Sequence, residues 1–392
     1  MTGPAILSRA GLDELIAALI ADGYRVIGPV AGDCAIELAE ISSGAQLPAG
    51  WGADSGPGWY RLRRRGDQAV FGHSAGSQSW KQFLHPPRQR LWSADASGFT
   101  PAREEPARLA FLGVRACDLA AIATLGRVLG GGAHQDSGFT RRRTGLFVIA
   151  AGCTEPGGVC FCASMGTGPQ PGPGYDLSLT ERIDGDGHRF LVDVGTEEGG
   201  RVLARISHRP AGDGEEREAR DAVQAAAGRM GRQMPDTDLA ALLRDSRESP
   251  RWAEIADRCL TCGNCTMVCP TCFCTTTEDS TGLAADGAAE RSQRWASCFE
   301  LDFSYLHGGS VRTSGASRYR QWITHKLSSW HDQFGGSGCV GCGRCVAWCP
   351  AAIDITEEAG KLAQDRGLPA LPEQDRDPGP DPGPGEGRDD QR

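Results

Sequence analysis

Hydrophobic residues recur at helical spacing near the beginning of the chain. Residues 12–20 place apolar side chains three or four positions apart, and Gly23 offers a stop for the predicted helix. Residues 24–30 then have the composition of a strand. The pattern therefore predicts that the chain opens with a helix followed by a strand. The apolar helical positions are Leu12, Leu15, Ile16, Leu19 and Ile20.

A strand, a turn and a helix are predicted further along the first half of the chain. Residues 109–114 have the uniform hydrophobicity of a buried strand, and residues 119–129 have a helical pattern with Asp118 as the expected N-cap. Residues 146–151 form a second buried strand. Further strands follow, including residues 190–194. Strands that alternate with helices in this way predict an α/β domain with a parallel sheet.

The second half of the chain has a helical pattern. Residues 208–220 are polar and predict a surface connection, whereas residues 220–257 predict helices. A stripe of large apolar residues follows later and is more typical of a buried core than of a cofactor site. The stripe consists of Tyr319, Trp322, Ile323, Leu327, Trp330 and Phe334.

Composition narrows the classes of protein that this chain can belong to. Its 41 basic and 50 acidic residues give a formal charge of −9, which gives no electrostatic support for nucleic-acid binding. Sixteen cysteines without a recognisable secretory signal indicate metal binding in a reducing compartment. No apolar run approaches the ~18 residues that span a bilayer. We therefore expect a cytoplasmic protein with no membrane span and no nucleic-acid partner.

Two cysteine runs carry the strongest chemical signal. Residues 259–270 and residues 339–350 both follow the pattern C-x2-C-x2-C-x3-C-P. In such a run three thiolates hold one [4Fe–4S] cluster and the fourth binds the neighbouring cluster. Gly263, Gly341 and Gly343 give the backbone freedom that the tight loops need.

The cross-over rule assigns the eight cysteines to two clusters. Zinc sites usually pair two CxxC units across a longer gap, so neither zinc nor disulfides fit two matched runs well. The first cluster has as ligands Cys259, Cys262, Cys265 and Cys349. The second has Cys339, Cys342, Cys345 and Cys269.

A further quartet of cysteines follows the two predicted parallel strands. Cys117 lies in the turn after the first strand, where a helix dipole would favour its thiolate, and the others lie in the loop after the second. Loops at the carboxyl ends of parallel strands converge, so these residues are candidates for a third cluster. The alternative is buried thiols and loop packing. The quartet is Cys117, Cys153, Cys160 and Cys162.

Four cysteines remain outside these sets. Cys272, Cys274 and Cys298 are candidates for a further cluster, for tuning a neighbouring one or for packing, and three ligands without a fourth are left unassigned. Cys34 stands alone and is expected to be a small buried hydrophobe. Basic residues within the apolar stripe are expected on a solvated face, although they can also cover a negatively charged cluster. They are Arg318, Arg320, His325 and Lys326.

These elements predict an α+β protein of three parts. Residues 1–220 form an α/β domain with cluster-binding loops, and residues 221–366 form an α-helical ferredoxin-like domain with two [4Fe–4S] clusters. The segment between the two runs is too long for a small all-loop ferredoxin, which favours helices there. Residues 367–392 are rich in proline and glycine and are expected to be a disordered tail.

Several separated motifs resemble the family of cytoplasmic [NiFe] hydrogenase (sulfhydrogenase) beta subunits, to which the A subunit of anaerobic sulfite reductase also belongs. The resemblance runs from the first helix to about residue 358. One departure is Ala296, where the family pattern has Asp, and the proline-rich tail is another. The motifs are Gly113-Val-Arg-Ala-Cys117-Asp-Leu, Cys160-Phe-Cys162-Ala-Ser-Met-Gly-Thr-Gly-Pro169, Cys269-Pro-Thr-Cys-Phe-Cys274, Trp295-Ala-Ser-Cys298 and Cys339-Val-Gly-Cys-Gly-Arg-Cys345.

The resemblance implies an iron–sulfur electron-transfer subunit of an oxidoreductase complex that is not catalytic alone. Its implied partners are a flavin- and NAD(P)-binding subunit and the catalytic subunits of a hydrogenase or a sulfite reductase. The sequence itself has no dinucleotide-binding glycine motif, no P-loop and no paired CxxC motifs of nickel ligands near its ends. Two other hypotheses stay open: a sulfur- or disulfide-reducing enzyme that uses Cys272, Cys274 and Cys298, and a zinc-stabilised interaction module.

Overall fold

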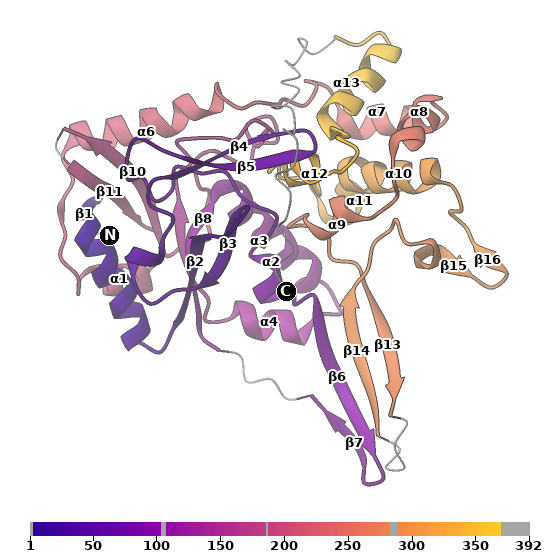
Figure 1. Cartoon of the computed structure of the whole chain (residues 1–392), viewed down its shortest axis with the longest axis horizontal. Helices are drawn as coiled ribbons and strands as arrows, with labels where there is room; N and C mark the ends of the chain where they lie inside the picture. Colours follow the sequence, from indigo (N-terminus) through magenta and orange to yellow (C-terminus); the bar gives the residue numbers. More distant parts are fainter. Residues whose placement is uncertain (1–2, 103–106, 186, 283–287, 370–392) are drawn as a thin grey trace, which may run out of the picture.

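A computed structural model describes residues 3–102, 107–185, 187–282 and 288–369. A large mixed sheet with its helices makes up one part of the molecule, a helical region that carries both cysteine runs lies beside it, and a long β-arm projects away from both (Figure 1). The fold is therefore mixed α/β. Of the tail expected over residues 367–392, residues 370–392 lie outside the described residues.

The large sheet has eight strands in the order β12-β1-β11-β10-β9-β8-β2-β3. Its four neighbouring strands β2, β8, β9 and β10 run parallel, and antiparallel strands extend the sheet at both edges. The strands are β1 (Ala5–Ser8), β2 (Arg25–Ala31), β3 (Ile36–Glu40), β8 (Leu109–Arg115), β9 (Phe147–Ala151), β10 (Leu177–Asp184), β11 (Gly187–Val194) and β12 (Arg209–Pro210).

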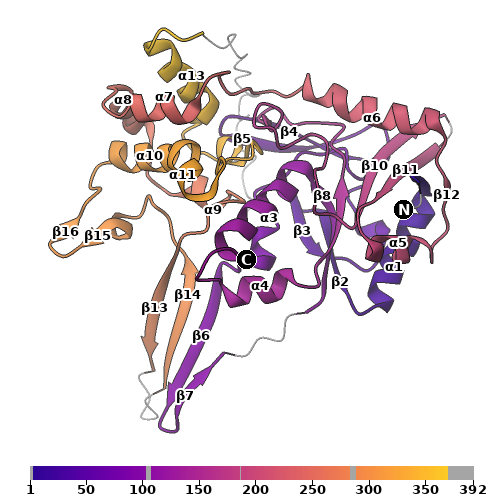
Figure 2. The same cartoon turned by 180° about the vertical axis from the view of Figure 1, so that it is seen from behind.

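Helices cover both faces of this sheet. Helix α1 (Arg9–Ala21) packs on one face, where Leu12 and Ile16 contact the core side chains of the strands. Helices α3 (Ala116–Leu129) and α4 (Ser137–Arg143) pack on the opposite face, as Figure 2 shows. Strands β8 and β9 are buried on both faces, which accounts for their uniform hydrophobicity in the sequence.

The predicted helix and strand at the start of the chain are confirmed, but a strand precedes them. Strand β1 pairs antiparallel with β11, so it is held by residues almost the whole domain away in sequence. Three further helices on this part of the chain are α2 (Lys81–Leu84), α5 (Glu197–Leu203) and α6 (Asp213–Ala227). The predicted surface connection at residues 208–220 is mostly exposed, but α6 makes much of it helical, which was not predicted.

A bulge in β8 sets the position of the residues that follow it. The register with β9 shifts between Leu112 and Val114, and Gly113 between them has φ +88°, a conformation that favours glycine. Helix α3 then begins with Arg115 as its N-cap. The prediction that Asp118 caps this helix was wrong, because Asp118 lies inside the first turn and pairs with an arginine described below.

The helical region has its own hydrophobic core. Trp322, Ile323 and Leu327 from the predicted apolar stripe lie in it, as do Val159 and Phe161 from the loop after β9. The first part of the chain therefore contributes side chains to the core of the second. The elements are α7 (Leu239–Asp245), α8 (Arg251–Arg258), α9 (Asn264–Met267), α10 (Gly315–Thr324), a π-helical turn His325–Ser329, α11 (Trp330–Phe334), α12 (Arg344–Ala347) and α13 (Ile355–Asp365).

The β-arm is a four-stranded antiparallel sheet in the order β13-β14-β6-β7. Two of its strands come from the first half of the chain and two from the segment between the cysteine runs. That segment is therefore partly helical, as predicted, and its strands β13 and β14 are an addition that the sequence did not indicate. The strands are β6 (Arg88–Asp95), β7 (Gly98–Pro101), β13 (Thr275–Thr281) and β14 (Ala289–Trp295); two small hairpins are β4 (Trp51–Gly56) with β5 (Trp59–Arg64) and β15 (Tyr305–Leu306) with β16 (Gly309–Ser310).

Among the described residues, no helix has the length and apolar character needed to cross a lipid bilayer.

Candidate iron–sulfur centres

The two cysteine runs adopt the same backbone path. Gly263 and Gly343 both have φ +75° and precede the short helices α9 and α12, and the residues two positions before them, Thr261 and Gly341, have φ +49° and +65°. All three glycines that were predicted to need backbone freedom have a positive φ.

Packing against the quartet loop explains why residue 341 is a glycine. A Cβ atom on Gly341 would lie 2.6 Å from the backbone nitrogen of Cys162. The Phe161 N–H also donates to the Gly341 carbonyl at 2.9 Å. The quartet loop therefore rests directly on the second run. In the first run Thr261 has the corresponding positive φ, and a Cβ atom on Gly315 at the start of α10 would lie 3.1 Å from Thr261 Cγ2.

The four cysteines that were assigned to the first cluster line one cavity of about 450 Å³, called here the first-run cavity. Backbone N–H groups donate to two of its sulfurs: Thr261 to Cys259 at 3.4 Å and Ile353 to Cys349 at 3.4 Å. Such N–H···S contacts are typical of cluster ligands. The structure thus brings Cys349 of the second run to Cys259, Cys262 and Cys265 of the first, as the cross-over rule requires.

The four cysteines assigned to the second cluster also lie near one another. Burial raises the pKa of the Cys345 thiol well above its usual value, and the nearby sulfurs of Cys339, Cys342 and Cys269 raise it further. Gly341 N–H donates to Cys339 Sγ at 3.5 Å.

Lys326 is a charged group in direct contact with this second set. Its Nζ donates to Cys269 Sγ at 3.3 Å, to Thr271 Oγ1 at 3.0 Å and to the Gly338 carbonyl at 3.2 Å. The side chain is buried, so the expectation of a solvated face is wrong for Lys326. The pKa of Cys269 is lowered well below its usual value, first by a hydrogen bond from the Cys272 thiol and, against the effect of burial, by the Lys326 charge.

The quartet also converges. Cys117, Cys153, Cys160 and Cys162 line one cavity of about 420 Å³, called here the quartet cavity. Cys117 comes from the start of α3 and the other three from the loop after β9, so the carboxyl ends of two neighbouring parallel strands supply the set. Cys342 of the second run lines the same cavity. The predicted convergence of the quartet therefore matches the geometry.

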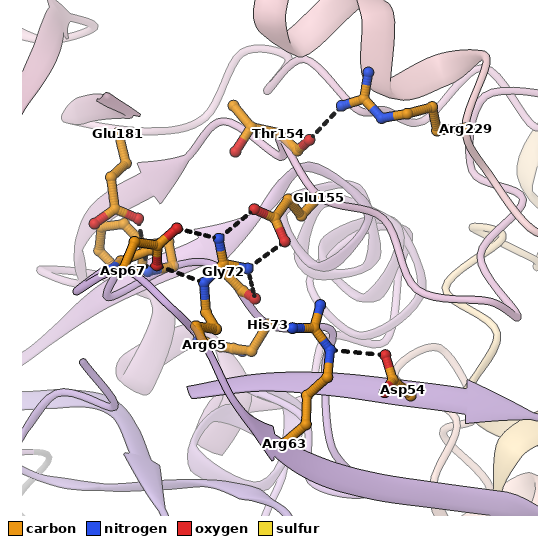
Figure 3. Close-up of polar contacts among 12 residues, drawn as sticks. Asp54, Arg63, Arg65, Asp67, Gly72, His73, Thr154, Glu155, Glu181 and Arg229 are labelled. Carbon is orange, nitrogen blue, oxygen red and sulfur yellow. Dashed lines mark hydrogen bonds and ion pairs between the residues drawn. The ribbon is translucent and has the colours of Figure 1, made fainter. Parts of the chain in front are cut away.

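A polar network fixes the loop that carries Cys153 (Figure 3). The guanidinium of Arg65 pairs with Asp67, and its Nη2 lies 2.6 Å from Glu155 Oε1. Arg229 donates to the Thr154 carbonyl at 2.7 Å, so both residues after Cys153 are held in place. Neither support of the loop was identified from the sequence, because Glu155 and Thr154 lie far along the chain from Arg65 and Arg229.

Two buried ion pairs fasten the quartet to the cysteine runs. Arg344, between Cys342 and Cys345, makes a bidentate pair with Asp118 beside Cys117 at 2.8 and 3.0 Å. Arg232 Nε contacts Asp354 Oδ2 at 2.6 Å, and the Arg232 N–H donates to the Cys160 carbonyl at 3.1 Å.

The cavities contain buried polar groups that fit an iron–sulfur cluster. The Tyr319 hydroxyl and Trp322 Nε1 at the first-run cavity, and Arg115 Nη1 at the quartet cavity, have no hydrogen-bond partner among the described residues. Cluster sulfides accept hydrogen bonds from such donors. Burial also raises the pKa of Cys160 and of Cys339 to about 12, so a metal charge is needed to hold these sulfurs as thiolates.

Within the described residues, no three or more His, Cys, Asp or Glu side chains are arranged to share one metal ion. The cysteines of a cubane have a different arrangement, because each binds a different iron.

The remaining cysteines divide into a set and a single residue. Cys272, Cys274 and Cys298 line a common cavity of about 570 Å³, called here the three-cysteine cavity. Cys34 is exposed, so its expected burial was wrong.

Comparison with known proteins agrees with this geometry. Residues 258–353 match the model of a 4Fe-4S dicluster domain. The chain is 31% identical to sulfhydrogenase 2 subunit beta of Pyrococcus furiosus over 277 residues, which are 70% of this chain and 79% of the relative. No solved structure matches. The chain is thus an iron–sulfur electron-transfer subunit that carries [4Fe–4S] clusters, and it belongs to the sulfhydrogenase beta-subunit family.

Proposed function

We propose that this chain relays electrons between a flavin- and NAD(P)-binding subunit and the catalytic subunit of a [NiFe] hydrogenase. In this proposal it carries three [4Fe–4S] clusters. Cys259, Cys262, Cys265 and Cys349 hold the first, Cys339, Cys342, Cys345 and Cys269 hold the second, and the quartet Cys117, Cys153, Cys160 and Cys162 holds the third. Each bound cluster supplies one-electron chemistry, and the chain alone is not a catalyst.

The observation that carries this proposal is that the second set shares a wall with each of the others. Cys345 lines the first-run cavity, and Cys342 lines the quartet cavity. A continuous series of centres, with the second set in the middle, is the arrangement that an electron relay needs. Adjacent centres that share a protein wall allow electrons to cross without leaving the chain.

The partners follow from the family and from what the sequence lacks. The relative is named as the beta subunit of a sulfhydrogenase, a name that implies an enzyme of several subunits. The sequence of this chain has neither a dinucleotide-binding glycine motif nor a P-loop, so we assign hydride exchange with NAD(P) to a partner.

The side chains around the second set favour its reduced form. Lys326 places a buried positive charge against Cys269. Arg344 lies beside Cys342 as well, but its charge is balanced in part by Asp118. Positive charge and N–H donors near sulfur stabilise the added electron and raise the reduction potential. The second centre would thus accept electrons more readily than a centre without these cations.

Iron and sulfide analysis of the anaerobically purified chain tests the number of clusters in this relay. The three assigned sets predict at least about twelve irons per chain, at four per cubane, and visible absorption that dithionite bleaches. Zinc in place of iron, or an absence of bleaching, contradicts the proposal. About eight irons per chain would mean that only the two cysteine runs bind clusters.

Affinity isolation of the tagged chain from its own cells under anaerobic conditions tests the partners. Hydrogen-dependent reduction of benzyl viologen and of NAD(P)⁺ in the isolated complex is the expected result. Sulfite-dependent oxidation of a reduced viologen, without hydrogen uptake, would assign the chain to a sulfite reductase instead.

A further inference from the structure

The base of the β-arm gathers three cysteines that the relay does not use. Cys272 and Cys274 immediately precede β13, and Cys298 follows β14. These strands pair from Thr275 opposite Trp295, and the Ala296 N–H donates to the Cys274 carbonyl at 2.9 Å. The hairpin therefore holds the three thiols at one end, where they line the three-cysteine cavity.

The spacing of these cysteines repeats that of the quartet. Cys160-Phe-Cys162 places both of its sulfurs on the quartet cavity, and Cys272-Phe-Cys274 places both of its sulfurs on the three-cysteine cavity. The three-cysteine cavity, at about 570 Å³, is at least as large as the two cavities that four cysteines line. The space at these three cysteines is therefore no smaller than the space at either four-cysteine set.

Two buried lysines lie beside the three cysteines. The Lys81 ammonium donates to the Cys272 carbonyl at 2.9 Å, and Lys326 lines the cavity. Both side chains are buried, and neither pairs with a carboxylate among the described residues. Lys326 also contacts Cys269 of the second set, so its charge already faces one proposed cluster. Lys81 lies over the Trp295 ring at 3.6 Å, beside Cys272. A buried cation without an anionic partner is costly, so a negatively charged group is expected next to Lys81.

A buried hydrogen-bond donor at the three-cysteine cavity also lacks a partner among the described residues. Trp330 lines the cavity, is 2% exposed, and its Nε1–H has no hydrogen-bond partner among the described residues. The sulfides of an iron–sulfur cluster accept such bonds, and the cluster with its thiolates carries the missing negative charge.

We infer that Cys272, Cys274 and Cys298 bind a further [4Fe–4S] cluster through three thiolates, with one iron that has no cysteine ligand. The three-cysteine cavity has no fourth cysteine in its lining, and Cys269, which contacts Cys272, belongs to the second set. Partly exposed Phe303, Gln321 and His325 line the same cavity, where they leave the fourth iron open to a small ligand other than a thiolate.

The position of this site makes the relay branched rather than linear. Cys272 hydrogen-bonds Cys269 of the second set, and Trp322 lines both the first-run cavity and the three-cysteine cavity. The further cluster is thus next to two of the three proposed centres. An electron that reaches the second centre has two routes onward from it.

Iron content and electron paramagnetic resonance of the full chain test this inference, which extends the proposed function. The double variant Cys274→Ala/Cys298→Ala is compared with Cys34→Ala, which removes an exposed cysteine away from these sets. We expect the wild type and the control to hold about sixteen irons and the double variant about twelve. Equal iron in all three overturns the inference and leaves the relay intact, whereas a chain without iron contradicts the relay itself.

A second measurement uses only the wild-type chain, so its result does not depend on whether a variant folds. A cubane with three cysteine ligands releases its fourth iron when it is mildly oxidised, so anaerobic ferricyanide should convert one cluster per wild-type chain to a [3Fe–4S] form with its own resonance signal. Ferrous iron and reductant should reverse the change. Failure of the wild type to give this signal overturns the inference.

Discussion

Arg344 and Asp118 form a bidentate ion pair in which both side chains are only 3% exposed. Asp118 follows Cys117 at the start of α3, and Arg344 lies between two cysteines of the second run. Arg344 Nε also donates to the carbonyls of Gly76 and Gln78 at 3.1 Å each. The pair therefore joins the quartet to the second set across the two halves of the chain.

The first prediction concerns this pair. Arg344→Ala should lower stability by about 3–5 kcal/mol, because it leaves the Asp118 carboxylate buried without its partner. The midpoint of thermal loss of visible absorption under anaerobic conditions measures the effect. Arg366→Ala is the matched control, because its pair with Asp245 is exposed and should contribute at most about 1 kcal/mol. Equal effects of the two substitutions would contradict the prediction.

The second prediction concerns the packing of the quartet loop on the second run. Gly341→Ala should reduce the iron content by about four or more per chain. The new Cβ atom would meet the Cys162 backbone at 2.6 Å, and that backbone cannot move away without moving its sulfur. Thr261→Gly tests the same backbone position in the first run and should retain all of its iron. Full iron in the Gly341 variant would show that the loop can shift.

The third prediction concerns the reduction potential of the second centre. Lys326→Met should make one potential more negative by at least about 60 mV, a tenfold change for a one-electron couple, because it removes a buried positive charge next to Cys269. A potentiometric titration followed by paramagnetic resonance measures the shift. Lys361→Met removes a half-exposed lysine that pairs with Glu357 and should leave every potential unchanged.

The fourth prediction concerns pH. Burial and, to a smaller extent, the nearby Lys81 charge lower the pKa of His85 to about 4. Between about pH 6.5 and 4 the unfolded chain binds a proton that the folded chain does not, so folding should lose about 1.4 kcal/mol per pH unit as the pH falls through this window. Unfolding midpoints of His85→Gln and wild type between pH 7 and pH 5 should then converge. The exposed His208→Gln variant should keep the wild-type slope.

The elements that sequence predicted best are those that local pattern determines. The helix at Arg9–Ala21 and the strands at Leu109–Arg115 and Phe147–Ala151 have an apolar periodicity of their own. Strands β13 and β14 lack such a pattern, because the arm exposes much of both faces and its sequence is polar. Only their pairing with β6 and with each other makes them strands.

The same distinction holds for the candidate centres. The spacing of the runs predicts which cysteines converge, since a short loop has few ways to surround a cluster. The role of Asp118 depends on Arg344, which lies 226 positions away, so the local reading of a helix cap was wrong. Lys326 likewise has the sequence context of a surface residue, and only the fold places it against sulfur.

Phe161 and Val159 lie in the hydrophobic core of the helical region, although they belong to the loop after β9. A fragment that begins after this loop would open a hole beside Trp322 and Leu327 and would lack the surface on which Gly341 rests. Unlike a free-standing ferredoxin, the dicluster segment at residues 258–353 depends on a loop of the large sheet for part of its hydrophobic core.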